Sequence, residues 1–340
     1  MNSLITLTSG GTVALNEGLL GWTSAPCGGS DLAGHVRSIG HGLRAAFAPV
    51  CEQNTRSLSF RVPDQRFGSV NVTGLLRERS SDSLALIVHG LAGSATSRYC
   101  AMAAEAAYRA GYDSFRISMR GADMSGEDIY HAGLSSDIAA LLSDSRFSHY
   151  RRIVLLGYSF GGNIALRSAL DNVDSRLAAV AAICPPLDLA AVMNACDTPS
   201  RFVYKRAINV GLNRAYAQVE ARGRAVTPFR LVAQARQCSD WNEAAIVPRF
   251  GFRSVQDYYE QVSVIPDLHR LKVPCLVVAA SNDPIVPAHT VRWALGEGAG
   301  PVTVRWAFGG HLAFAPNLDL GMPRARTGLE NQVFEWLRHV

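Results

Sequence analysis

Residues 152–170 read RIVLLGYSFGGNIALRSAL, and this stretch decides the fold class. Its first five residues are almost all apolar and its second half has a helical period, so we expect a strand, a sharp turn and a helix. The turn from Gly157 to Gly161 fits the pattern G-x-S-x-G, in which a strained turn exposes a serine hydroxyl. Glycine is required at both ends because side chains there would collide where the strand and the helix cross. Ser159 is therefore the candidate nucleophile.

The remaining chain alternates between short apolar runs closed by turn-forming residues and segments of helical period. Such runs are typical of strands buried on both faces, and the alternation predicts a doubly wound, mostly parallel α/β sheet. A ligand site is then expected beyond the carboxyl ends of the strands. The predicted strands are Arg56–Val62 and Val70–Glu78 (a pair), Ser83–His89, Tyr112–Met119, Arg152–Leu156, Leu177–Cys184, Val273–Ala280 and Val302–Phe308. The predicted helices are Arg98–Ala110, Leu134–Leu142, Phe160–Leu170, His289–Leu295 and Arg326–Arg338.

One long segment interrupts this alternation and predicts the domain organisation. Residues 188–265 look mostly helical and are rich in aromatic side chains, so we expect them to form a cap insertion above the sheet. The α/β core then comprises residues 56–187 and 266–340. Residues 1–55 form a poorly patterned N-terminal segment.

A serine hydroxyl needs a base beside it at neutral pH, and the partners are expected on loops that follow later strands, first an acid and then a histidine. Asp283 follows a predicted strand in the sequence Ser-Asn-Asp-Pro, and His311 follows the last one after Gly-Gly. His311 would accept the proton of Ser159, and Asp283 would hold the imidazole tautomer. Asp188 is the rival for the acid, because it follows the preceding strand.

The loop after the first core strand, His89-Gly90-Leu91, is where we expect a backbone amide that stabilises the negative charge formed in the reaction. We expect the backbone amides of Leu91 and Phe160 to form an oxyanion hole, with the latter at the start of a helix. His89 is expected to brace the loop rather than to transfer protons.

Composition excludes several classes of function. The 340 residues are 48% hydrophobic with a net charge of +5, and we find no nucleic-acid-binding module in the sequence. The seven cysteines show no metal-binding spacing, so no metal or organic cofactor is expected. No apolar run reaches the length of a membrane span and no signal peptide is apparent, so the expected location is cytoplasmic.

These residues resemble the α/β-hydrolase superfamily and, within it, the YheT-like branch, which contains hydrolases and medium-chain acyltransferase relatives. The resemblance covers residues 30–340. It implies an eight-stranded, mostly parallel sheet flanked by helices, with Ser159, Asp283 and His311 as the triad. The segments that carry it are Gly34-His35 with Ser38, His89–Ser94, Arg120-Gly121, Tyr130–Gly133 with Asp137, Gly157–Asn163, Gly251-Phe252 with Asp257–Tyr259, Ser281–Pro287 and Gly309–His311. Within them, we interpret Asp137 as a helix-start charge and His131 as a loop-bracing residue.

The predicted function is therefore a serine hydrolase of carboxylic esters with short- to medium-chain acyl groups, or of acylglycerols. Its substrate would be a small-molecule acyl ester, and the aromatic cap could line an apolar acyl pocket. Two alternatives stay open: an acyltransferase that passes the acyl group to an alcohol, and a non-catalytic ligand-binding relative. The sequence also leaves open the oligomeric state and a peripheral contact with a membrane.

Overall fold

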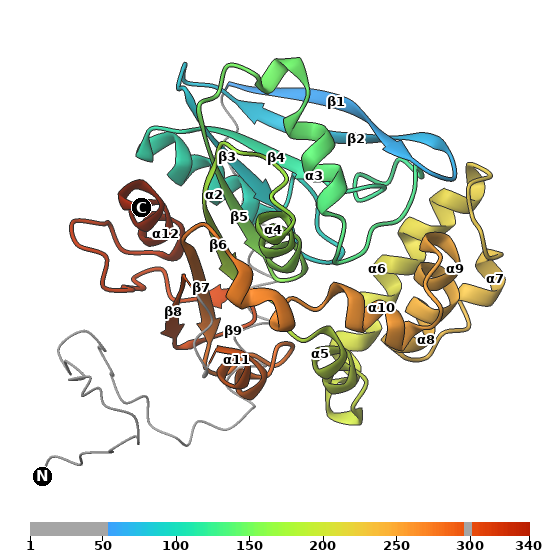
Figure 1. The fold of residues 1–340 in the computed structure, drawn as a ribbon. Helices are drawn as coiled ribbons and strands as arrows, with labels where there is room; N and C mark the ends of the chain where they lie inside the picture. Colours follow the sequence, from blue (N-terminus) through green and yellow to red (C-terminus); the bar gives the residue numbers. More distant parts are fainter. Residues whose placement is uncertain (1–53, 296–300) are drawn as a thin grey trace, which may run out of the picture.

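An eight-stranded sheet forms the centre of the computed structural model, which describes residues 54–295 and 301–340 (Figure 1). Its strands are β1 (Thr55–Asp64), β2 (Gly68–Arg77), β3 (Ser83–Val88), β4 (Asp113–Ser118), β5 (Arg152–Tyr158), β6 (Leu177–Ile183), β7 (Cys275–Ala280) and β8 (Val302–Ala307). They lie in the order β1-β2-β4-β3-β5-β6-β7-β8. β2 is antiparallel to both of its neighbours and all other pairs are parallel. The predicted eight-stranded, mostly parallel sheet is therefore confirmed.

Helices cover both faces of this sheet: α3 (Ser135–Leu142), α4 (Phe160–Leu170) and α11 (Ala288–Leu295) on one face, α2 (Arg98–Ala110) and α12 (Leu329–His339) on the other. Side chains of β3 show why the strands must be apolar at every position. Leu84, Leu86 and Val88 pack into the core beneath α3 and α4, whereas Ala85 and Ile87 pack into the core beneath α2 and α12. Each strand of this kind is buried on both faces, as its continuous apolar run predicts.

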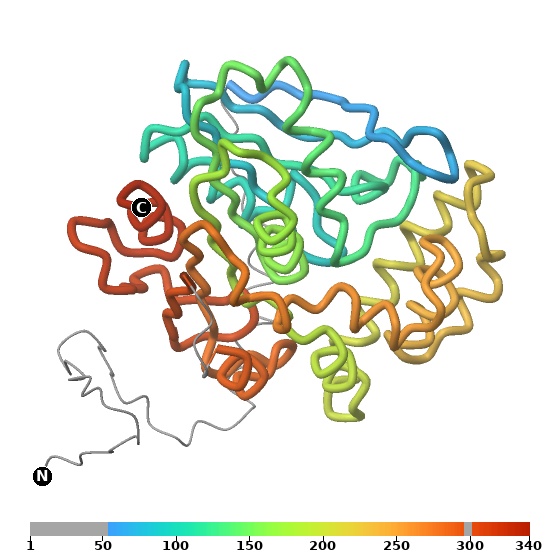
Figure 2. Tube along the Cα trace, viewed as in Figure 1, coloured from blue at the N-terminus to red at the C-terminus, as the bar shows by residue number. Residues whose placement is uncertain are grey.

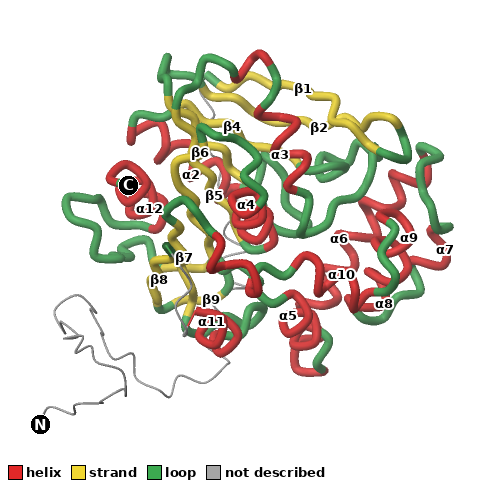
Figure 3. The backbone as a smooth tube through the Cα atoms, viewed as in Figure 1, coloured by secondary structure: helices red, strands yellow, loops and turns green. Residues whose placement is uncertain are grey.

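Between β6 and β7 the chain leaves the sheet and forms a group of helices at one side of it, which Figures 1 and 2 show in yellow to orange. Figure 3 shows that helices and loops make up this group. They are α5 (Leu189–Cys196), α6 (Phe202–Ala221), α7 (Phe229–Val232), α8 (Cys238–Trp241), a π-helical turn (Asn242–Ile246), α9 (Val247–Phe250) and α10 (Val255–Val262). The predicted cap, residues 188–265, falls on this segment, and its boundaries as a separate domain stay a prediction.

Element boundaries differ from the predicted ones by a few residues. β5 continues through Gly157 to Tyr158, and α12 begins at Leu329 rather than Arg326, because Gly328 has a non-helical backbone with φ +99°. The predicted N-terminal segment 1–55 lies almost entirely outside the described residues, and so do Gly34, His35 and Ser38. Within the described ranges, no helix is both long and apolar enough to cross a membrane.

Candidate active site

Ser159 lies on a strained turn between β5 and α4. Its backbone has φ +50° and ψ −119°, a conformation that non-glycine residues adopt only where surrounding structure enforces it. The backbone is tightly packed on both sides of this serine: a Cβ atom on Gly157 would lie 2.1 Å from the carbonyl oxygen of Gly161, and one on Gly161 would lie 2.3 Å from that of His89. Both glycines of the G-x-S-x-G pattern are therefore required by close backbone contacts.

The imidazole of His311 lies between Ser159 and Asp283. Its Nε2 is 2.9 Å from Ser159 Oγ, and its Nδ1 is 2.9 Å from Asp283 Oδ2 and 3.1 Å from Oδ1. Asp283 comes from the turn after β7, and His311 lies in the turn between two short strands, β9 (Gly309–Gly310) and β10 (Ala313–Phe314). The three side chains, far apart in the sequence, thus form one hydrogen-bonded chain.

The Asp283 side chain is almost fully buried and is fixed by its own turn. Its Oδ1 accepts hydrogen bonds from the backbone amides of Ile285, at 2.8 Å, and Val286, at 2.9 Å. Two amide donors and the imidazole hold the carboxylate in this position. Asp188, the rival acid, instead caps helix α5, because its carboxylate accepts a hydrogen bond from the amide of Ala191.

His89 braces the loop after β3, as the sequence indicates. Its Nε2 accepts a hydrogen bond from the amide of Met119, and its Nδ1 donates to the carbonyl oxygen of Gly90 at 2.7 Å. Burial lowers the pKa of His89 to about 4, so the imidazole stays neutral with its proton on Nδ1.

A cavity of about 290 Å³ opens beside Ser159 and His311. Leu91 and Phe160, the two predicted oxyanion-hole positions, both line it. Much of its remaining wall is apolar. This part comes from the segment between β6 and β7 and from the turn after β7: Pro186, Val192, Met193, Cys196, Ile208, Cys238, Ile285 and Val286. The arrangement offers an apolar space directly beside the serine hydroxyl.

Cys184, which sequence analysis did not single out, lies directly after β6 and next to the triad. Its Sγ and one ligand atom each of Asp283 and His311 lie within 4.8 Å of one another, a set that could hold a metal ion. A metal there would compete with the His311–Asp283 hydrogen bond. Burial, with the Asp283 charge adding to it, raises the pKa of the Cys184 thiol well above its usual value, so the thiol stays protonated and a poor ligand.

Asp137 belongs to a buried ion network in addition to its place at the start of a helix. This residue lies in the first turn of α3 as predicted, but its carboxylate binds Arg120 through two hydrogen bonds of 2.6 Å. Arg120 also contacts Asp64 and Asp128, and Arg249 binds the same two carboxylates. The charge at the helix start is thus one member of a five-residue network of buried side chains.

His131 lies near this network and is enclosed by aromatic rings, so its interpretation as a loop-bracing residue agrees with its contacts. Its Nδ1 accepts a hydrogen bond from the amide of Gly133. Burial, reinforced by Arg120 and Arg249, lowers the pKa of His131 to about 3. The rings in contact are those of Phe250, Phe252 and Tyr258.

Comparison with known proteins identifies relatives of this chain and its fold family. The chain is 27% identical to the putative esterase YheT of Escherichia coli over 74% of this chain and 75% of the relative. It is 25% identical to the medium-chain fatty acid ethyl ester synthase/esterase 2 of Saccharomyces cerevisiae over 68% of this chain, which is only 58% of the relative. These matches bear out the resemblance to the YheT-like branch.

Among solved structures, the Pyrococcus furiosus esterase Pf2001 has a TM-score of 0.50 at 18% identity, covering 76% of this chain and 85% of that one. At that identity the likeness concerns the fold alone. The sequence profile described as "alpha/beta hydrolase fold" matches residues 86–314, which is more than half of the chain and includes the serine turn, the acid and the histidine. With its sheet, turn and profile in agreement, the chain belongs to the alpha/beta hydrolase fold family.

Proposed function

We propose that this protein is a serine hydrolase that cleaves carboxylic esters with short- to medium-chain acyl groups, or acylglycerols, through an acyl-enzyme on Ser159. The observation that carries the proposal is the position of the His311 imidazole, 2.9 Å from Ser159 Oγ on one side and 2.9 Å from Asp283 Oδ2 on the other. A hydroxyl with a base in hydrogen-bond contact, and a carboxylate behind that base, is the arrangement that nucleophilic catalysis by serine requires.

In the first half of the reaction, Ser159 Oγ attacks the ester carbonyl carbon while its proton passes to His311 Nε2. The oxyanion that forms is stabilised by the backbone amides of Leu91 and Phe160, and the imidazolium by the Asp283 carboxylate. When the bond between the carbonyl carbon and the alcohol oxygen breaks, the leaving alkoxide takes the proton from His311. The alcohol departs and the acyl group remains on Ser159.

In the second half, water attacks the acyl-enzyme as His311 Nε2 takes one of its protons. Collapse of the tetrahedral intermediate breaks the bond to Ser159 Oγ, and His311 returns the proton to that oxygen. A carboxylic acid is released and the enzyme is restored. The apolar cavity of about 290 Å³ would hold the acyl chain during both steps.

An acyltransferase reaction is the second candidate, in which an alcohol replaces water in the second half. The yeast relative is named as an ethyl ester synthase as well as an esterase, which favours this candidate. Analysis of the products formed from p-nitrophenyl butyrate with and without added ethanol separates the two. An acyltransferase gives ethyl butyrate as the main product, whereas a hydrolase gives butyric acid.

The decisive variant is Ser159→Ala, assayed with p-nitrophenyl butyrate. We expect kcat to fall by about 10⁵–10⁶-fold, as when a triad serine is removed, with unchanged thermal unfolding. Ser148→Ala is the matched control, because Ser148 is an exposed serine after a short 3₁₀ helix. A fluorophosphonate should label wild type and the control on Ser159 but not the Ser159→Ala variant. Hydrolysis by Ser159→Ala at the wild-type rate would exclude this nucleophile, and a wild type that neither turns over esters nor reacts would favour a non-catalytic relative.

A further inference from the structure

The peptide group between Gly90 and Leu91 is held by an unusual number of hydrogen bonds. Its carbonyl oxygen accepts from His89 Nδ1 at 2.7 Å, from the Gly93 amide at 3.0 Å and from the Tyr130 hydroxyl at 3.2 Å. The N–H of Leu91 belongs to the same rigid, planar peptide unit. Holding the oxygen therefore fixes the direction in which the Leu91 amide points, and three donors on the oxygen also polarise that amide.

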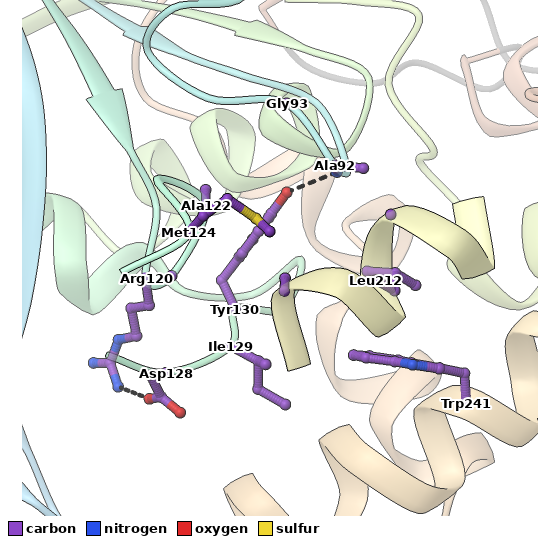
Figure 4. A pocket seen from close by; sticks show the side chains of 13 residues that line it. Ala92, Gly93, Arg120, Ala122, Met124, Asp128, Ile129, Tyr130, Leu212 and Trp241 are labelled. Atoms are coloured by element: carbon purple, nitrogen blue, oxygen red, sulfur yellow. Dashed lines mark hydrogen bonds and ion pairs between the residues drawn. The ribbon is translucent and has the colours of Figure 1, made fainter. Parts of the chain in front are cut away.

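Tyr130 is the member of this set that comes from another part of the fold. Its hydroxyl accepts a hydrogen bond from the amide of Ala92 at 3.1 Å, which Figure 4 shows. The same hydroxyl donates to the carbonyl oxygen of Gly90, so it bridges the two peptide groups on either side of Leu91. Figure 4 shows the ring reaching from the loop that carries it up to the Ala92 backbone. The contact ties residues 90–92 to a segment about 40 positions away in the chain.

The ring of Tyr130 also contacts the other side of the candidate oxyanion hole. It packs edge-to-face against Phe160, with ring centroids 5.9 Å apart, and against His89 at 5.4 Å. Aromatic pairs in this geometry are stabilising beyond the area they bury, so the ring itself is held in place. One side chain thus contacts both segments whose amides would face the oxyanion.

We propose that Tyr130 is a positioning residue for the oxyanion hole: through Gly90 and Ala92 it holds the Leu91 amide in the orientation that stabilises the charge formed when Ser159 attacks. This inference rests on the proposed function. In this role Tyr130 does not touch the substrate. It acts through the backbone of residues 90–92. Because negative charge on the oxygen is greatest in the transition state, loss of the hydroxyl lowers kcat and leaves KM nearly unchanged.

The test is Tyr130→Phe, which keeps the ring and removes both hydrogen bonds of the hydroxyl. We expect kcat for p-nitrophenyl butyrate to fall about tenfold, less than the 10²–10³-fold that follows complete loss of a donor. Tyr216→Phe is the matched control, because the Tyr216 hydroxyl likewise donates to a carbonyl and accepts from an amide, both of Thr227. This control should show a similar loss of thermal stability with wild-type kcat.

A second readout reports the oxyanion hole directly. Butylboronic acid becomes tetrahedral when Ser159 Oγ bonds to its boron and the serine proton passes to His311, so it mimics the charged intermediate. Its inhibition constant should rise about tenfold in Tyr130→Phe and stay unchanged in Tyr216→Phe. A Tyr130→Phe enzyme with wild-type kcat and wild-type inhibition constant would overturn the proposal, whatever its stability. The proposed function itself is tested separately, with Ser159→Ala. If that variant remained active and still bound the boronate, the proposed function would be wrong, whatever the result for Tyr130→Phe.

Discussion

Acid should unfold this protein at a pH where most carboxylates are still ionised, and His131 is a principal cause. The imidazole is buried and neutral, with its Nδ1 occupied by the Gly133 amide and two buried guanidinium groups, Arg120 and Arg249, nearby. A protonated imidazole would have to lose its hydration and face these positive charges. Its pKa is therefore lowered from 6.5 to about 3 on folding.

The size of the effect follows from this difference in pKa. Below pH 6.5 the unfolded chain binds a proton at His131 that the folded protein does not bind, so stability falls as the pH falls, down to the folded pKa. Between pH 7 and pH 5 the loss is about 2 kcal/mol from this one residue. Burial lowers the pKa of His89 to about 4, which adds a similar loss over the same range. The raised pKa values of buried Asp137 and Glu330 act in the opposite direction, so the contribution of His131 must be isolated by substitution.

The variant for this purpose is His131→Asn, in which the side-chain oxygen can still accept the hydrogen bond from the amide two residues later. Urea unfolding, followed by tryptophan fluorescence, gives the free energy of unfolding at pH 7 and at pH 5. We expect the variant to be less stable than wild type at pH 7 and this gap to narrow by about 2 kcal/mol at pH 5. His269→Asn is the control, because it makes the same substitution at an exposed histidine. A gap that stays constant between the two pH values would refute the reasoning.

Two further predictions test the site and the turn that carries it. Asp283→Asn should lower kcat for p-nitrophenyl butyrate by about 10⁴-fold, because an amide no longer holds His311 in the required tautomer. Asp188→Asn should retain activity, since asparagine caps a helix about as well as aspartate; the reverse result would show that the acid has been assigned to the wrong residue. Gly157→Ala should prevent normal folding or lower the thermal midpoint strongly, because its Cβ would lie 2.1 Å from the carbonyl oxygen of Gly161. A Gly157→Ala protein with the wild-type midpoint and activity would contradict the steric argument.

Much of the fold could be predicted from the sequence because its signals are local. Ser83–Val88 is apolar at five of six positions and is followed by turn residues, and it forms β3 with those five residues buried. The turn at Ser159 could be predicted because both glycines that it requires lie within five consecutive residues, 157–161. The expected partners Asp283 and His311 follow from chain order and from their places after strands. In the structure His311 contacts Ser159, and Asp283 contacts His311.

Contacts between distant segments could not be predicted in the same way. A carboxylate near a helix start is stabilising there, and this alone accounts for Asp137 from its sequence neighbours. In the structure, however, Arg120 binds this carboxylate, and Arg120 also binds Asp64, which lies 56 positions before it. Nothing near Asp137 in the sequence indicates these partners. The role inferred for Tyr130 depends likewise on a hydrogen bond to Gly90, 40 positions away. The sequence around Tyr130 does not indicate this contact.

The close approach at the serine turn also explains how the two halves of the candidate site come together. β3 and β5 are parallel neighbours with Val88 opposite Gly157, so the loops that follow them begin side by side. Gly161 then lies against the carbonyl oxygens of Val88 and His89, which brings the start of α4 to the loop that carries Leu91. Sheet register and close packing at Gly161 therefore bring the two proposed oxyanion-hole segments together, whereas part of the cavity wall comes from the segment between β6 and β7. If the cavity holds the acyl chain as proposed, substitutions in that wall should change the chain-length preference without moving the amides, because the two sets of residues belong to different parts of the fold.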